Sequence, residues 1–168
     1  MLRVIFDTNI YGNLLEEKDG AKIEERIQQE KDFIVYGFKP IRQEIRDIRP
    51  VTKLSRKTRI VLLELYDKIT GNHFLQNSIK ITSLARKYYD YYRNLGGIYG
   101  WDTSIRIDFM IVACASFHGL DIVYSADDKT LLGKHALKAY NHINMKENLR
   151  TPHFLRYEDL LKKFRGLL

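Results

Sequence analysis

Short runs of apolar residues along the chain predict the strands of a parallel sheet. The runs Leu2 to Phe6, Phe33 to Tyr36 and Ile122 to Tyr124 are rich in Val, Ile and Phe, and none of them alternates cleanly with polar residues. Strands covered by helices on both faces have this continuous apolar pattern. His153 to Tyr157 is predicted as a further strand.

Segments with helical spacing separate these runs. Asn9 is expected to cap a first helix from about Ile10, and Pro40 opens a helix with apolar residues at spacings of four and three. Glycines at the ends of two later segments are typical of helix C-caps. Two helices are predicted to start near residues 10 and 40. Others are predicted over 22–30, 55–69, 84–95, 104–118 and 158–164, and one more is predicted after residue 128.

The alternation of strands and helices predicts an α/β fold, a three-layer sandwich whose central, mostly parallel β-sheet is flanked by helices. At roughly 150 residues per domain, the 168 residues predict one domain over 1–168, with a helical insertion at about 52–100. The single cysteine excludes a disulfide framework and favours a reducing, cytoplasmic location. The longest apolar run is too short to span a bilayer, so no membrane association is expected.

The charge is basic and uneven. The chain has 28 Lys and Arg against 21 Asp and Glu, a net charge of +7, and residues 39–59 hold eight basic and two acidic residues, or +6. A basic surplus favours a polyanionic partner such as RNA. Arg42, Arg46 and Arg49 are therefore candidate contacts for phosphate groups, although such a run can also be a solvated helix face with short-range ion pairs.

Three acidic residues stand out from their surroundings. Asp7 directly follows the first predicted strand, and Asp127 follows the third by two residues. Asp108 lies in a helix that is apolar on nearly every face, where an isolated carboxylate is costly to desolvate. Open parallel sheets place their sites beyond the carboxyl ends of the strands, so these acids are expected to converge there.

Clustered carboxylates, without a cysteine cluster or paired histidines, indicate a hard divalent cation such as Mg²⁺ or Mn²⁺. Beside a basic surface, that arrangement is typical of a nuclease that activates water against a phosphodiester. Other roles remain open for each acid: Asp7 as a helix cap, Asp127 or Asp128 as the cap of the next helix, and Asp108 in an ion pair with Arg106.

This set of motifs resembles the PIN domain family of metal-dependent ribonucleases, which includes VapC-type toxins. The matching pieces are the first strand with Asp7-Thr8-Asn9, the second strand followed by a helix with Glu44, the Asp108 helix, and the segment from His118 to Asp127. The resemblance spans nearly the whole chain. It implies a central parallel sheet flanked by helices and hydrolysis of RNA.

The resemblance also implies the roles of individual residues. Asp7, Glu44, Asp108 and Asp127 are implied as the acidic quartet that binds one or two Mg²⁺ or Mn²⁺ ions and supports catalysis. Asn9 and Ser125, with Asp128 beside the last acid, are implied to orient a carboxylate or a water by hydrogen bonds. Glu64 is an alternative to Glu44, Asp128 is an alternative to Asp127, and Asp102 is a candidate fifth acid.

Several functions stay open at this stage. The leading hypothesis is an endoribonuclease, either a toxin with a partner antitoxin protein or an RNA-processing enzyme; a non-catalytic RNA-binding module is the alternative. A dehalogenase-like phosphotransferase would need a second acid where the chain has Asn9. Tyr88, Tyr89, Tyr91 and Tyr92 suggest either RNA stacking or burial in the core or a homodimer contact. A glycine-rich loop with Tyr99 and Trp101 leads into the Asp108 helix.

Overall fold

The computed structural model describes residues 1–48 and 53–166. The strands are β1 (Leu2–Phe6), β2 (Phe33–Phe38), β3 (Phe74–Leu75), β4 (Ile122–Ser125) and β5 (His153–Arg156). The helices are α1 (Thr8–Glu16), α2 (Gly20–Gln29), α3 (Lys39–Arg46), α4 (Lys53–Thr70), α5 (Ile79–Asn94), α6 (Ile105–Phe117), α7 (Lys134–Lys146) and α8 (Tyr157–Arg165).

The strands form one parallel sheet in the order β3-β2-β1-β4-β5. The central strand β1 pairs with β2 and with β4, and Val4 is in register with Val35 on one side and Ile122 on the other. All of the strands point the same way, so their carboxyl ends meet at one edge. The predicted α/β fold with a parallel central sheet is confirmed.

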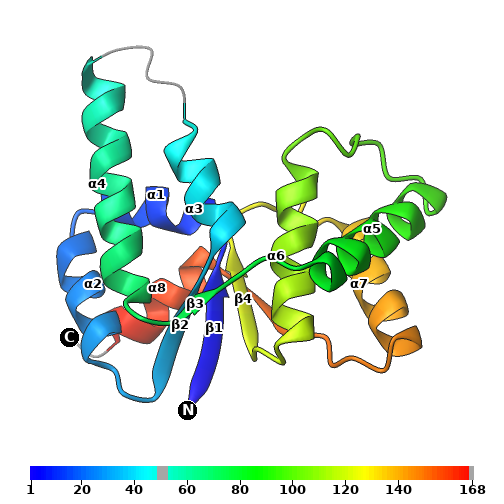
Figure 1. The fold of residues 1–168 in the computed structure, drawn as a ribbon. Coiled ribbons are helices and arrows are strands. Elements are labelled where there is room, and N and C mark those ends of the chain that lie inside the picture. Colours follow the sequence, from blue (N-terminus) through cyan, green and yellow to red (C-terminus); the bar gives the residue numbers. More distant parts are fainter. Residues whose placement is uncertain (49–52, 167–168) are drawn as a thin grey trace.

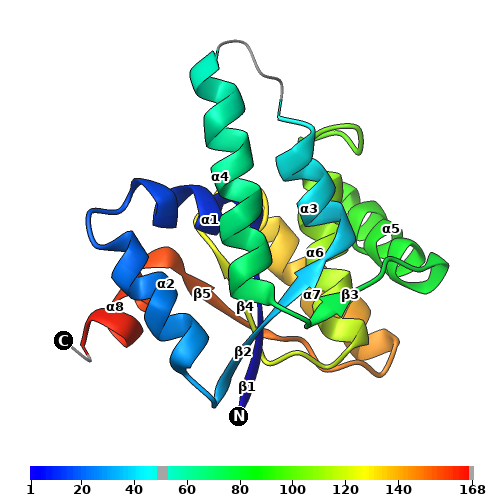
Figure 2. The same cartoon turned by 60° about the vertical axis from the view of Figure 1, so that its left-hand side comes forward.

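Helices cover both faces of this sheet, which makes three layers (Figure 1). Helices α1, α2, α4 and α8 lie on one side, and α5, α6 and α7 lie on the other. Figure 2 shows α3 at the end of β2, next to α4 and α6, beyond the carboxyl edge of the sheet. The layers therefore leave α3 and the starts of α1 and α6 around this edge.

Helix α6 explains the apolar segment that surrounds Asp108 in the sequence. It packs against the sheet and against α5, so that every residue from Asp108 to Ser116 is buried. The Phe109 ring meets the rings of Tyr88, Tyr92 and Tyr140 edge to face. A helix covered on most sides has no need of a polar face.

Two of the four tyrosines of α5 are core residues. Tyr88 and Tyr92 are buried, whereas Tyr89 and Tyr91 are half-buried. Tyr91 stacks on His142 of α7, with 4.1 Å between ring centroids. RNA stacking is thus wrong for Tyr88 and Tyr92, because their rings fill the interior of the protein.

Several element boundaries differ from those that the sequence pattern predicted. Strand β3, with only two residues, carries no pattern of its own and forms because the Gly37 N–H bonds the His73 carbonyl oxygen at 2.7 Å. Helix α3 ends at Arg46, so Ile48 lies beyond it and is 39% exposed. Helix α1 begins at Thr8, two residues earlier than expected, because its N-cap is Asp7 and not Asn9.

In the described part of the chain, none of the helices is both long enough and apolar enough to cross a membrane.

A buried polar network joins α5, α6 and α7. The Tyr88 hydroxyl donates to Asn144 Oδ1, and Asn144 Nδ2 donates to Ser116 Oγ at 2.9 Å and to Thr151 Oγ1 at 3.0 Å. Buried polar groups are costly when a partner is removed.

Tyr88→Phe is expected to destabilise the protein by about 1–3 kcal/mol, because it leaves the buried Asn144 oxygen without a donor. Urea unfolding measures this change. Tyr91→Phe is the matched control, since the Tyr91 hydroxyl bonds no described residue, and it is expected to change stability by less than about 0.5 kcal/mol. Equal losses of stability in the two variants would contradict a stabilising role of the Tyr88 hydrogen-bond network.

Candidate active site

Asp7 lies at the carboxyl end of the central strand, and both of its carboxylate oxygens are engaged. As the N-cap of α1, its Oδ1 accepts the Thr8 N–H at 2.7 Å. Its Oδ2 accepts the Ser125 hydroxyl at 2.7 Å and the Asn9 amide at 2.8 Å. Asp7 can therefore cap α1 and belong to the site at the same time.

Asn9 and Ser125 also fix the loop after β4. Asn9 Oδ1 accepts the Ala126 N–H at 3.1 Å, and Ser125 Oγ accepts the Asp127 N–H at 3.0 Å. Asn9 thus bonds Asp7 with its amide nitrogen and the β4 loop with its amide oxygen, whereas the Ser125 hydroxyl donates to Asp7 and accepts from the loop. The ends of β1 and β4 are held together by side chains as well as by the strand ladder.

Asp127 is held in a tight turn. It accepts the backbone N–H groups of Lys129 and Thr130 at 2.9 and 3.0 Å, and the Thr130 hydroxyl at 2.6 Å. Burial raises the pKa of Asp127, but these hydrogen bonds outweigh it and lower the pKa below its usual value. Asp127 does not cap α7, whose N-cap is Gly133, and it is ionised at neutral pH.

Asp108 lies in the first turn of α6 and is only 5% exposed. Among the described residues, its Oδ2 has no hydrogen-bond partner, and it makes no ion pair with Arg106. Burial, followed by the charge of Asp7, raises the pKa of Asp108 to about 8, although a hydrogen bond with Thr130 opposes the rise. At neutral pH this carboxyl group carries a proton, which removes the cost of a buried charge.

Glu44 reaches the same place from α3. It is half-buried, and the Thr8 hydroxyl donates to its Oε2. Its charge raises the pKa values of Asp7 and Asp108. Glu64, the alternative to Glu44, lies on an exposed position of α4.

Two other acids of the sequence do not join this group. Asp128 forms an ion pair with Arg156 of β5 at 2.9 Å and is 55% exposed. Asp102 is exposed in the loop before α6. The structure therefore brings Asp7, Glu44, Asp108 and Asp127 together and leaves Asp102 and Asp128 outside this group.

Burial and mutual repulsion perturb the ionisation of this acidic cluster, which comprises Asp7, Glu44, Asp108 and Asp127. Burial is the largest cause of the rise in the pKa of Asp7 to about 6; the Ser125 hydrogen bond opposes it, and the charges of Glu44 and Asp127 add to it. Such perturbed groups in one place are typical of functional sites.

The cluster offers only oxygen donors, which suit Mg²⁺ or Mn²⁺, and Asp108 Oδ2 is a buried oxygen without a described partner. The donor chemistry therefore fits a divalent cation. Among the described residues, however, no three Asp, Glu, His or Cys side chains are placed so that they could hold a metal ion. Binding of an ion to the cluster would therefore include a rearrangement of these side chains.

The candidate phosphate contacts are engaged in ion pairs. Arg42 forms two hydrogen bonds with Asp67, both at 2.9 Å, and Arg46 pairs with Asp47 at 3.1 Å. Both arginines remain well exposed, at 41% and 58%. Arg49 lies outside the described residues. Arg42 and Arg46 therefore lie on a solvated helix face and form short-range ion pairs, which is the alternative that the sequence left open.

Two contributors to the site were not singled out from the sequence. Thr8 joins Asp7 to Glu44, and Thr130 fixes Asp127. A threonine three residues after an aspartate is a signal for a turn closed by the aspartate side chain. The link from Thr8 to Glu44 spans 36 positions and carries no local signal.

Similarity to known proteins is found at the level of the fold. No protein-family model matches the chain, and no curated protein sequence matches it. Among solved structures, the chain is similar to FitAB bound to an IR36 DNA fragment, with a TM-score of 0.57 and 14% sequence identity. The likeness covers 92% of this chain and 94% of that chain. It shows the fold, which is PIN-like.

Asp108→Asn is expected to stabilise the protein, and more strongly at pH 8 than at pH 5. Burial holds the folded-state pKa values of Asp7 and Asp108 above the ordinary value of an aspartate, so the folded state retains protons that the unfolded state has lost. Stability therefore falls as the pH rises from about 4 through 8. The neutral amide introduced by Asp108→Asn avoids this loss.

The check is the melting temperature across this pH range, where 1 kcal/mol corresponds to about 2–4 °C. We expect a gain of several degrees at pH 8 and a smaller gain at pH 5. Asp102→Asn, at an exposed acid near the start of α6, is the control and should leave the pH profile unchanged. If Asp108→Asn raised the melting temperature by the same amount at every pH, the assignment of the raised pKa to Asp108 would be wrong.

Proposed function

We propose that the protein is a Mg²⁺- or Mn²⁺-dependent endoribonuclease that hydrolyses RNA phosphodiesters at the acidic cluster. One observation carries the proposal. Asp7 and Asp108 are buried at the carboxyl edge of the sheet, and their pKa values are raised by burial and by the charges of Glu44 and Asp127. A fold gains no stability from such a group of acids, so a function accounts for it better than packing does.

The residues of the cluster have different tasks in this proposal. Asp7 is held by Asn9 and Ser125, so its carboxylate is oriented before any ligand arrives. Asp127 is ionised at neutral pH, whereas Asp108 must first lose its proton. A divalent ion bound there would supply positive charge that lowers the pKa of a water molecule and offsets the charge of the phosphodiester.

The basic surplus supports the choice of RNA as substrate. The net charge is +7, and the helix that carries Glu44 also carries Arg42 and Arg46. An attack on a phosphodiester beside carboxylates needs nearby cations to hold the negatively charged strand. Lys39, at the start of the same helix, is exposed and can contribute.

The likeness to FitAB adds a proposal about partners. We infer that the protein acts in the cytoplasm, either as a toxin controlled by an antitoxin protein or as an RNA-processing enzyme, with a homodimer as a further option. The PIN-like fold and the single buried cysteine support this inference.

A non-catalytic RNA-binding module is the second candidate. The observation in its favour is that, among the described side chains, no three potential ligands are arranged for a metal ion. Binding of RNA without cleavage in Mg²⁺ and in Mn²⁺ would establish this alternative. The two functions share the basic surface and differ only in the use of the acids.

Cleavage of a mixed pool of single-stranded RNA tests the proposal directly. The wild type is expected to cut in Mg²⁺ or Mn²⁺ and not in EDTA. Asp7→Asn and Asp108→Asn should each lose activity roughly 100-fold or more, and Ser125→Ala about 10- to 100-fold, because Ser125 only orients Asp7.

Two conservative variants are the controls for this assay. Asp128→Asn and Glu64→Gln remove acids that lie outside the cluster and should stay within about twofold of the wild type. If they lose as much activity as Asp7→Asn, the cluster is wrongly assigned. Cutting that persists in EDTA would reject the role of the metal.

Metal binding is expected to be measurable without any substrate. Mn²⁺ at about 100 times its dissociation constant should stabilise the fold by about 2.7 kcal/mol, which raises the melting temperature by roughly 5–10 °C. The increase should be larger at pH 8 than at pH 6, because the carboxyl of Asp108 has a pKa of about 8 and binds metal only when deprotonated. Asp108→Asn should remove most of it, while metal-free buffer with EDTA serves as the baseline.

A further inference from the structure

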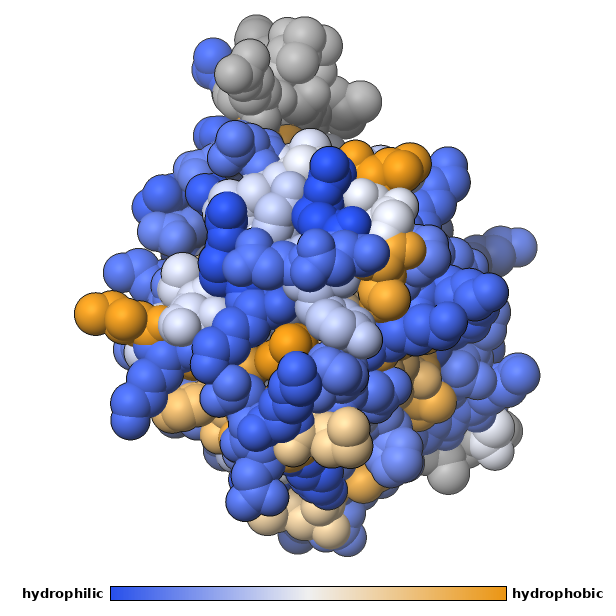
Figure 3. Space-filling view, turned by 90° about the vertical axis from the view of Figure 1, so that its right-hand side faces the viewer, coloured by the Kyte–Doolittle hydropathy of each residue, from blue (hydrophilic) through white to orange (hydrophobic). Residues whose placement is uncertain are grey.

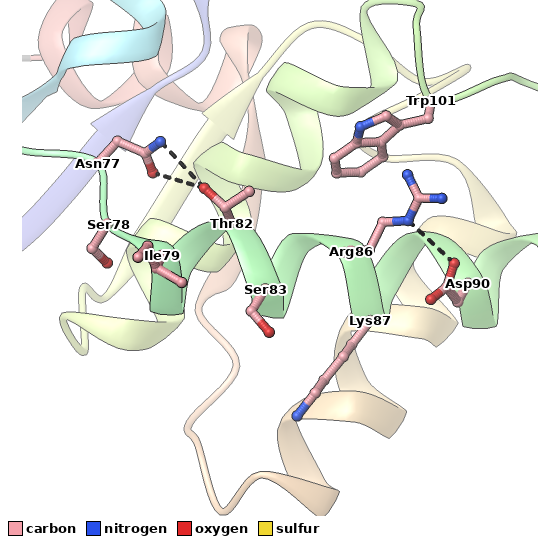
Figure 4. Close-up of a pocket in the computed structure, with 9 residues that line it drawn as sticks. All are labelled: Asn77, Ser78, Ile79, Thr82, Ser83, Arg86, Lys87, Asp90 and Trp101. Carbon is pink, nitrogen blue, oxygen red and sulfur yellow. Dashed lines mark hydrogen bonds and ion pairs between the residues drawn. The ribbon is translucent and has the colours of Figure 1, made fainter.

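A hollow of about 800 Å³ runs along α5, and none of the residues of the acidic cluster line it. Trp101, the only tryptophan of the chain, stands over it from the loop before α6 and faces Arg86 of α5 (Figure 4). The Arg86 guanidinium lies 5.0 Å from the centroid of the Trp101 ring. The Trp101 backbone N–H also bonds the Tyr89 hydroxyl at 3.0 Å, which fixes the position of the ring on α5.

A second hollow, of about 400 Å³, adjoins the first one on the side of α3 and α6. The two share Asn77, Thr82 and Trp101 in their linings. The second hollow reaches α3 and α6, where its lining includes Gln43 and Ile107. The path from Trp101 therefore reaches the two helices that carry Glu44 and Asp108.

The charged side chains that line the second hollow are all positive. Lys39 and Arg106 line the second hollow, which has no acidic residue in its described lining, and neither of them forms an ion pair with a described residue. In the first hollow, Arg86 pairs with Asp90 at 3.5 Å, while Lys87 turns away to Glu147. Two cations without a described ion-pair partner therefore line the second hollow together with Trp101.

The surrounding surface favours a polar ligand. Hydrophilic residues dominate the face of the molecule on the side of α5 and α7, and the hydrophobic ones are scattered in small groups (Figure 3). A large apolar patch, which a docked protein would cover, is not seen on the described part of this face.

We propose that a single-stranded segment of RNA lies along these two hollows, with one unpaired base against Trp101 and Arg86 and with phosphates at Lys39 and Arg106. This inference rests on the proposed function and identifies which part of the substrate lies outside the cluster. Aromatic rings and arginine planes stack on bases that are not paired. The path therefore selects single strands over duplexes.

The fluorescence of Trp101 tests this directly, because no other tryptophan contributes. The protein in EDTA is titrated with a single-stranded RNA of about 12 nucleotides and with the same RNA as a duplex. Quenching of Trp101 is expected with the single strand and much less with the duplex. Absence of quenching when anisotropy of labelled RNA shows binding would overturn the proposal.

Single substitutions distinguish the proposed contact with a base from the proposed contacts with phosphates. Trp101→Leu is expected to weaken single-strand binding at least roughly fivefold, while Trp101→Phe retains most of the affinity. Lys39→Gln and Arg106→Gln should each reduce the slope of log affinity against log salt by about 0.7. Lys22→Gln, on α2 across the sheet, is the matched control and should leave affinity and slope unchanged.

The same variants separate this inference from the proposed function. If the wild type cuts RNA and all of the variants cut with an unchanged KM, the path is wrong and the nuclease stands. If single-stranded RNA quenches Trp101 and no metal supports cutting, the path stands and the nuclease is wrong. A protein partner that quenches Trp101 where RNA does not would reject the path as an RNA site.

Discussion

The parallel pairing of β1 with β4 is the constraint on which the candidate site depends. It places the end of the central strand beside the end of its neighbour, so that the Asp7 N–H bonds the Tyr124 carbonyl at 2.9 Å and Ser125 bonds the Asp7 carboxylate at 2.7 Å. Helix α1 starts directly after Asp7, and the turn with Asp127 starts just beyond Ser125. A single strand pairing thus positions two acids, and the helices that pack on the sheet bring in Glu44 and Asp108.

The cost of this arrangement is electrostatic, and bound protons offset it in the free protein. Burial holds the pKa of Asp108 near 8 and that of Asp7 near 6, so the folded chain retains protons that would otherwise dissociate. A cation at the same oxygens would replace those protons. The stability of the fold and the proposed chemistry therefore depend on the same carboxylate oxygens. A substitution that relieves the repulsion between these carboxylates stabilises the fold and weakens the site.

The sequence pattern was enough to predict the strands β1, β2, β4 and β5, because each is a short apolar or β-prone run. It failed at β3, whose two residues form a strand only because β2 is alongside, and it gave no bounds for α7. Among the acids, the pattern identified Asp7, Asp108 and Asp127 from their positions after strands or within an apolar helix. The resemblance named Glu44 and left Glu64 as an alternative. The structure adds that Glu44 contacts Thr8, a contact between elements 36 residues apart that carries no local sequence signal, and that Glu64 is exposed on α4.

The separation of Asp7 and Ser125 along the chain has a consequence for how the protein folds. These two residues are 118 positions apart, whereas β1 and β2 are joined by only the two helices α1 and α2. Pairing of β1 with β2 closes a short loop, but pairing with β4 must first overcome the entropy of closing a much longer one. The repelling carboxylates of Asp7 and Asp127 therefore meet only in the step that docks β4, when the rest of the core can compensate for their proximity.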